Sequence, residues 1–263
     1  MTPKGSSLTA SVDGVESTFA VNYLANFHLL SILSPALRVQ PPDRDVRIIM
    51  ATCSSYIGGQ LPEKVPLLTK AGRADTSGIT GGMYASSKLA LMTFAAAFQK
   101  HLSSYVRPDS FPMNAKVIMV DPGYTRTPGM RRFITFGSLW GLALYLITWP
   151  FWWLILKGPE QGAQTILHAA MEASYARGDG GMLLKECREY KVVKPDVYDE
   201  AKQKKLWEMT EQAIELLEKE GAVRRAKVKG DDKTSTNDVK AASQPVAEDK
   251  KRQSGSKRSR KAA

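Results

Sequence analysis

The side chains best suited to chemistry in this sequence are Tyr84 and Lys88, in the run YASSK at 84–88. Residues four apart on a helix share a face, so both side chains can point into one cleft. A phenol with a pKa of about 10 is a poor acid or base at neutral pH, and a nearby ammonium favours the phenolate and lowers that pKa. The spacing therefore predicts a proton-transfer couple, although it also occurs in helices that carry no site.

The elements that must position this pair alternate between helices and short apolar strands. Arg47–Thr52 and Lys116–Val120 are apolar runs of the length and composition of buried parallel strands. Helices are predicted over 19–37, 83–102, 159–171 and 198–220, and strands over 47–52, 116–120 and, less regularly, 181–184. Strands that alternate with helices predict an α/β fold with a parallel sheet.

Three companions surround the YASSK run in a fixed order. Asn22 lies on the first helix, Thr-Cys-Ser-Ser ends the strand at 47–52, and the sequence DPGYTRT at 121–127 follows the strand at 116–120. In this order and at these spacings, the residues resemble the short-chain dehydrogenase/reductase family, from about Val12 to Lys185. The resemblance implies a Rossmann-type, doubly wound parallel sheet. It also implies hydride transfer between a nicotinamide cofactor, NAD or NADP, and an alcohol or carbonyl.

The resemblance implies a role for each of these side chains. Tyr84 would be the general acid/base, and Lys88 would lower its pKa and bind the nicotinamide ribose. Asn22 would hold a water that links Lys88 to solvent, although an asparagine there could also simply cap or bend a helix. The residues that would line the nicotinamide are Pro122, Gly123, Thr125 and Thr127. The Pro-Gly pair could also be only a turn after a strand.

The resemblance does not by itself settle which hydroxyl would hydrogen-bond the substrate carbonyl. Matched without gaps, the serine of the family falls on Cys53, whose thiol is a poor donor. Ser54 or Ser55 could supply the hydroxyl if the strand end shifts by one or two residues. We predict Ser54. If Cys53 holds the position, polarisation of the carbonyl would be weaker.

Two motifs of the family are not found in this sequence, namely the Gly-rich turn after the first strand and an Asn-Asn-Ala-Gly segment. The turn would hold the cofactor pyrophosphate at a helix N-terminus. We therefore expect the N-terminal strands of the sheet to be missing, and with them the residues that separate NADP from NAD. The sequence is then either part of a longer enzyme or a short form that acts without catalysis as a membrane-bound interaction protein.

The stretch Phe133–Leu156 has no charged residue and contains four of the five tryptophans. As one helix it would be about 36 Å long, enough to cross a hydrocarbon core of ~30 Å. Pro150 would kink such a helix, so a helix–turn–helix that dips into one leaflet is an equal alternative, and an apolar lid packed on the body is a third. The stretch resembles the retinol/polyprenol dehydrogenase branch, which implies a lipid-like alcohol or carbonyl as substrate.

Composition divides the chain into a flexible N-terminus (1–18), a partial Rossmann-type catalytic domain (19–223, with the apolar segment 133–156) and a basic, disordered tail (224–263). The tail carries 13 basic and 5 acidic residues, a net of +8 out of the +11 of the whole chain. No aromatic residues interleave with its charges, so we expect no nucleic-acid partner.

The last four residues, 260–263, resemble a dilysine-type retrieval signal. With the apolar segment they favour a membrane-associated protein of the endoplasmic reticulum whose catalytic part faces the cytosol. A homodimer through the Tyr84 helix is possible by resemblance. Two cysteines and three histidines at spacings unlike those of zinc sites predict no metal site.

Overall fold

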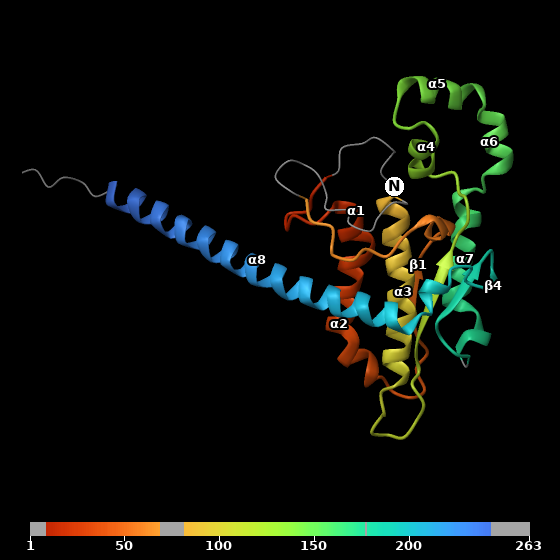
Figure 1. Cartoon of the computed structure of the whole chain (residues 1–263), viewed down its shortest axis with the longest axis horizontal. Coiled ribbons are helices and arrows are strands. Elements are labelled where there is room, and N and C mark those ends of the chain that lie inside the picture. The colour runs from red at the N-terminus through yellow and green to blue at the C-terminus, as the bar shows by residue number, and fades with distance from the viewer. Residues whose placement is uncertain (1–8, 69–81, 177, 243–263) are drawn as a thin grey trace, which may run out of the picture. The chain divides into compact units, whose positions relative to one another are not determined.

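The computed structural model describes residues 9–68, 82–176 and 178–242 (Figure 1), with side chains described as far as residue 226. The chain divides into two compact units after Leu217. The helices are α1 (Ser17–Phe19), α2 (Ala25–Arg38), α3 (Met83–Ser103), α4 (Pro128–Ile134), α5 (Leu139–Ile147), α6 (Trp149–Ile155), α7 (Pro159–Met171) and α8 (Glu200–Ala242). The short helical turns are η1 (Ala20–Leu24), η2 (Ser54–Gly58), η3 (Ala173–Ala176) and η4 (Pro195–Val197), and the strands are β1 (Val46–Ala51), β2 (Ala115–Asp121), β3 (Met182–Lys185) and β4 (Arg188–Tyr190).

The sheet has the strand order β1-β2-β3-β4, in which β1, β2 and β3 run parallel and β4 pairs antiparallel with β3. The predicted α/β fold with a parallel sheet is therefore confirmed, and the predicted strands lie within two residues of the observed ones. Strand β4 was not predicted, because its three residues are all exposed and carry no apolar pattern.

Strand β2 is the centre of the fold, since all its residues are buried. Successive side chains point to opposite faces of the sheet. Val117 and Met119 join the core beneath α3, whereas Ile118 and Val120 join a smaller core with Ala169 of α7. Helices thus cover both faces, with α3 on one side and α7 on the other (Figure 1), as a doubly wound sheet requires.

The larger core is aromatic where α2, α3 and the first turns of α8 meet. Phe27 of α2 and Phe94 of α3 have ring centroids 4.8 Å apart, and Trp207 of α8 lies 5.2 Å from the ring of Phe27. The hydroxyl of Tyr23 lies 2.7 Å from that of Thr210, and both side chains are fully buried. The first part of α8 is therefore held to the helix that carries the Tyr84 pair.

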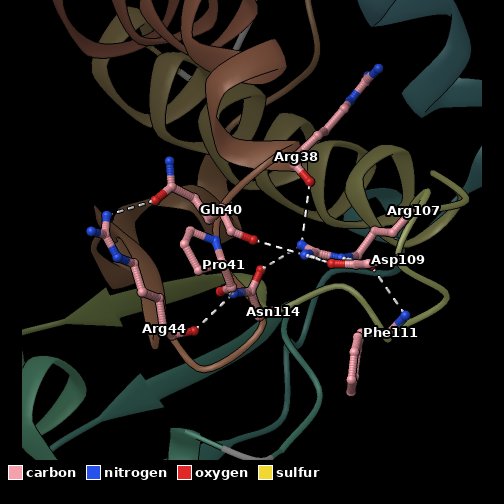
Figure 2. A network of polar contacts seen from close by, with 8 residues as sticks. All are labelled: Arg38, Gln40, Pro41, Arg44, Arg107, Asp109, Phe111 and Asn114. Carbon is pink, nitrogen blue, oxygen red and sulfur yellow. Dashed lines mark hydrogen bonds and ion pairs between the residues drawn. The ribbon is translucent and has the colours of Figure 1, made fainter.

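A buried arginine joins the loops that lead into β1 and β2 (Figure 2). Arg107 donates to the carbonyl oxygens of Arg38 and Gln40, at 3.3 and 2.8 Å, and pairs with Asp109. Asn114 accepts from Arg107 and donates to two further carbonyls of the first loop, at 2.7 and 2.9 Å. This network closes the end of the sheet opposite the polar segments that follow β1 and β2.

Order begins earlier in the chain than the predicted flexible segment 1–18 allows. Val15 and Glu16 have no exposed area, and Val15 forms an isolated antiparallel bridge with Leu67. The side chain of Glu16 accepts a hydrogen bond from the backbone of Phe19, which caps the first helix. The buried side chain of Val15 and the helix cap at Glu16 together attach this segment to the core.

Helix α8 continues to Ala242, beyond the predicted end at residue 220. The expected basic, disordered tail over 224–263 stays a prediction, and residues 243–263 lie outside the described part. No proline occurs between 224 and 242, and alanine, lysine and arginine are good helix formers.

The apolar stretch 133–156 does not form one helix. It contains the end of α4, then α5 and α6, which are separated at Thr148. Pro150 falls in the first turn of α6, where its missing N–H costs nothing, but it would break a continuous helix. In the described part of the chain, we find no helix with both the length and the apolar character needed to span a bilayer.

The contact between Tyr23 and Thr210 gives a test of the packing of α8. Thr210→Val keeps the shape of the side chain but leaves the buried hydroxyl of Tyr23 without its partner. We expect the free energy of unfolding to fall by about 1–3 kcal/mol. Thr210→Ser, which keeps the hydroxyl, should lose less. Chemical denaturation of the three proteins checks this, and an equal loss in both variants would contradict the role of the hydroxyl.

Candidate functional site

The candidate site lies where the parallel strands end. Open α/β sheets bind their ligands in the crevice beyond the carboxyl ends of the strands. Here β1 leads into Cys53, β2 leads into Pro122 and Gly123, and β3 ends at Lys185. Helix α3 brings Tyr84 to the same end.

The hydroxyl of Tyr84 is next to Cys53, not next to the predicted Ser54. The thiol of Cys53 lies 3.5 Å from the Tyr84 hydroxyl and 3.1 Å from the hydroxyl of Ser55. All four side chains are partly buried. The position that the gapless match gave to Cys53 is thus the one that faces the tyrosine, whereas a catalytic role for either residue stays a prediction.

Ser54 instead belongs to a network that joins all three parallel strand ends. Its hydroxyl donates to Asp121 at 2.5 Å and accepts from the ammonium of Lys185 at 3.0 Å. The second oxygen of Asp121 accepts from the backbone N–H of Gly123 at 2.9 Å. Gly123 has a φ of +75°, a conformation that favours glycine, so the carboxylate fixes the turn that carries Pro122.

Sequence reasoning missed two members of this network, Asp121 and Lys185. Asp121 is buried, and a buried carboxylate requires hydrogen-bonding partners. Its place at the end of an apolar strand, directly before Pro-Gly, was the available signal. Lys185 pairs with Asp121 in the register of β2 and β3, and no local pattern could reveal that pairing.

Lys88 lies near Tyr84, but its ammonium is turned to the backbone. It donates to the carbonyl oxygen of Ala51 at 3.0 Å and lies 5.9 Å from the centroid of the Tyr84 ring. Burial lowers the pKa of Lys88. Burial also raises the pKa of Tyr84, and its hydrogen bond with Cys53, which favours the protonated phenol, raises it further. In this conformation the pKa of the tyrosine is raised by desolvation, and the expected lowering by Lys88 stays a prediction.

Asn22 connects the first helical segment with the helix of Tyr84. It lies in η1, a π-helical turn between α1 and α2, and its side-chain amide donates to the hydroxyl of Ser87 at 3.0 Å. Ser87 donates in turn to the carbonyl oxygen of Tyr84 at 2.8 Å. Turns of π-helix are frequent at functional sites. Asn22 thus braces the start of α3, and its expected role in holding a water stays a prediction.

The start of α3 is also fixed by a close backbone approach. A Cβ atom on Gly59 would lie 2.4 Å from the carbonyl oxygen of Ala85. Only a glycine therefore lets the segment after η2 pack against the first turn of α3. The hydroxyl of Ser86, which is fully buried, accepts from the backbone of Gln60 at 3.0 Å. These contacts set the distance between Cys53 and the tyrosine.

The remaining predicted cofactor residues lie between β2 and α4. Thr127 caps α4, and its hydroxyl accepts from the backbone of Met130 at 3.3 Å. Thr125 bridges to Lys157 and packs on Gly162 of α7, where a Cβ atom would lie 2.3 Å from its methyl group. The turn is therefore held from both sides, and the structure brings it to the same strand ends as Tyr84.

A parallel sheet with helices on both faces places the chain in the α/β class of proteins, and its strand ends carry a tyrosine–lysine pair. No family model matches the chain. It is 40% identical over 208 residues to an uncharacterized oxidoreductase of Schizosaccharomyces pombe, covering 79% of the chain and 55% of that protein. It is 33% identical over 199 residues to a polyprenol dehydrogenase of Danio rerio (75% and 55%) and 27% identical over 209 residues to retinol dehydrogenase 14 of Mus musculus (80% and 55%).

The chain belongs to the short-chain dehydrogenase/reductase family, in the retinol/polyprenol dehydrogenase-like branch. It spans about half the length of the relatives that it matches. The resemblance drawn from the residues around Tyr84 is confirmed by relatives that cover about four fifths of the chain.

The burial of Lys88 predicts a pH-dependent stability. A lysine whose pKa is lowered by folding binds its proton more tightly in the unfolded chain, so it disfavours folding at pH 7 and loses this effect as pH rises towards its unfolded pKa of about 10.4. Lys88→Met should therefore raise the stability at pH 7, and the gain should shrink as pH increases.

Lys202 is the matched control, because it pairs with Asp196 and its pKa is raised. Lys202→Met should give no gain at pH 7. Denaturation of both variants from pH 6 to pH 10 is the measurement. A gain for Lys88→Met that does not change with pH would contradict desolvation as the cause.

Proposed function

We propose that this chain carries the catalytic part of an enzyme that interconverts a lipid-like alcohol and its carbonyl with a nicotinamide cofactor. The observation that carries the proposal is the position of the Tyr84 hydroxyl. It lies at the strand ends within hydrogen-bond reach of Cys53, on the helix that also carries Lys88. Relatives named as oxidoreductase, polyprenol dehydrogenase and retinol dehydrogenase support the reaction class.

The residues present fit the nicotinamide-ribose half of such a cofactor. At Gly123, a Cβ atom would meet only the ends of two side chains, those of Glu186 and Lys157, at 3.6 and 3.7 Å, and no backbone. Lys88 would bind the ribose hydroxyls, and the turn through Pro122 and Thr127 would line the ring. When bound, the nicotinamide accepts or supplies the hydride.

Each side chain of the site then has a defined task. Tyr84 takes or gives the hydroxyl proton of the substrate at its phenolic oxygen, as a general acid/base. Lys88 must exchange its bond to Ala51 for the cofactor and thereby bring its positive charge closer to the phenol, which lowers the pKa of the phenol. Cys53 stands beside the tyrosine where a weak donor contacts the substrate oxygen, and Ser54 supports it through Asp121.

The apolar surface of helices α5 and α6 supports a lipid-like substrate. These helices contain no buried residue, and in Figure 1 they project beyond the sheet on the chain between β2 and α7. An apolar surface of this kind suits the interface of a membrane, from which a long apolar alcohol could reach Tyr84. We therefore propose a membrane-associated protein that enters one leaflet, located at the endoplasmic reticulum with its catalytic part in the cytosol.

A homodimer through the Tyr84 helix stays a prediction. The first turns of α8 pack on α2 and α3 through Trp207 and Thr210, so that part of the surface of α3 is already covered within the chain. A dimer would have to use the remaining surface.

The second candidate function is a non-catalytic membrane-bound interaction protein. One observation favours it: β1 is an edge strand of the sheet that the described residues form, and only Met50 among its residues is buried. An open edge can pair with another chain. In this case, the residues at the strand ends would retain their geometry without turnover.

Tyr84→Phe decides between the two functions. Oxidation of a long-chain allylic alcohol in detergent micelles should be measured with NAD and with NADP by the appearance of the reduced cofactor. We expect Tyr84→Phe to lower the rate at least a hundredfold, because it removes the proton-transfer group. Tyr105→Phe, a tyrosine away from the strand ends, should retain activity. Absence of turnover in the unmodified chain would favour the non-catalytic protein, and equal turnover in both variants would contradict the role of Tyr84.

A further inference from the structure

The chain around the exposed helices α5 and α6 carries charges of one sign only. Between Asp121 and Glu160 there is no acidic residue, whereas four basic residues occur there. They are Arg126, Arg131, Arg132 and Lys157. Arg126, Arg131 and Arg132 precede α5, and Lys157 follows α6 after a single residue, Leu156. The positive charges therefore stand at both ends of the uncharged stretch.

The structure keeps these cations next to the apolar surface. The guanidinium of Arg126 lies 5.3 Å above the ring of Trp153, and its Nε is buried without a hydrogen-bond partner among the described residues. Arg131 and Arg132 are exposed on α4, which packs against α5. Lys157 is paired with Glu186 at 2.7 Å, so the two exposed arginines are the charges that this region offers to a partner.

The apolar surface beside them is too exposed for a protein that stays in water. Leu139 and Trp140 are 85% and 88% exposed, and Ile147 and Leu154 are each 78% exposed. Soluble monomers rarely expose contiguous apolar surface of this kind. An apolar surface bordered by basic side chains matches the interface of a bilayer, where apolar rings enter the acyl region and arginines reach the headgroups.

We propose that the segment 126–157 binds membranes that contain anionic phospholipids, with Arg131 and Arg132 contacting the headgroup phosphates and carboxylates. This inference rests on the proposed membrane association and adds the lipid class. Charge complementarity favours an anionic bilayer over a protein surface, because the segment offers no acidic group with which a mixed-charge partner could pair. Anionic headgroups add attraction for each basic residue close to the surface.

The basic tail offers a second source of attraction to anionic lipid. Its charges include Lys257, Arg258, Arg260 and Lys261. The test must therefore separate the two basic regions in the full chain. One variant combines Arg131→Gln with Arg132→Gln. The tail variant replaces the four tail residues by glutamine. The matched control combines Lys204→Gln with Lys205→Gln, two exposed lysines of α8.

Co-sedimentation with phosphatidylcholine vesicles, with and without phosphatidylserine, measures the partition of each protein. We expect phosphatidylserine to tighten binding of the unmodified chain, and added salt to weaken this gain. The Arg131/Arg132 variant should lose about tenfold or more of the gain while its binding to pure phosphatidylcholine stays unchanged. The Lys204/Lys205 control should keep the gain.

Three results would overturn the inference. A gain that survives in the Arg131/Arg132 variant and disappears in the tail variant would assign the lipid preference to the tail. Binding to neither kind of vesicle would remove the proposed membrane association itself. Equal binding to both vesicles would leave the association standing and reject only the preference for anionic lipid. A Leu139→Ser, Trp140→Ser variant that no longer binds phosphatidylcholine would show which helices enter the leaflet.

Discussion

The structure depends on the parallel pairing of one fully buried strand, β2, with β1 and β3. Parallel strands that are buried on both faces need helices above and below, and α3 and α7 supply them. The same pairing places the carboxyl ends of three strands side by side. Because each strand there ends in polar residues, the pairing also assembles the site: the buried Asp121 accepts from Ser54 and Gly123, and Lys185 donates to Ser54.

The site combines this rigid frame with side chains that are costly to bury. Tyr84 and Lys88 both lose solvation, which raises the pKa of the phenol and lowers that of the ammonium. In this conformation both pKa shifts favour the neutral forms of the two side chains. A bound cofactor that draws the ammonium away from Ala51 would shift the balance towards the charged pair. Desolvated groups that reduce stability at a strand end are typical of sites kept for chemistry.

The parts of the fold that depend on local pattern could be predicted, and those that depend on tertiary pairing could not. The boundaries of α3 and α7, the strand β2 and the pair Tyr84 and Lys88 follow from periodicity and spacing. The side chain next to the tyrosine could not be predicted in this way, because a shift of one residue at the end of β1 exchanges Cys53 for Ser54. The link between Asp121 and Lys185 requires the register of β2 and β3. The sequence did not determine whether the apolar stretch forms one helix or two. In the structure it divides at Thr148, and Pro150, in the first turn of α6, is incompatible with one continuous helix.

The central claim is that the strand ends of this chain form the nicotinamide-ribose half of a dinucleotide site. Saturation-transfer NMR of the full chain with nicotinamide mononucleotide tests it most directly, with adenosine 5′-monophosphate as the comparison ligand. We predict transfer to the nicotinamide ring and ribose protons, a marked loss of that transfer in Lys88→Met, and little transfer to the adenosine ligand. Equal transfer to both ligands, or transfer to nicotinamide mononucleotide that Lys88→Met leaves unchanged, would contradict the account.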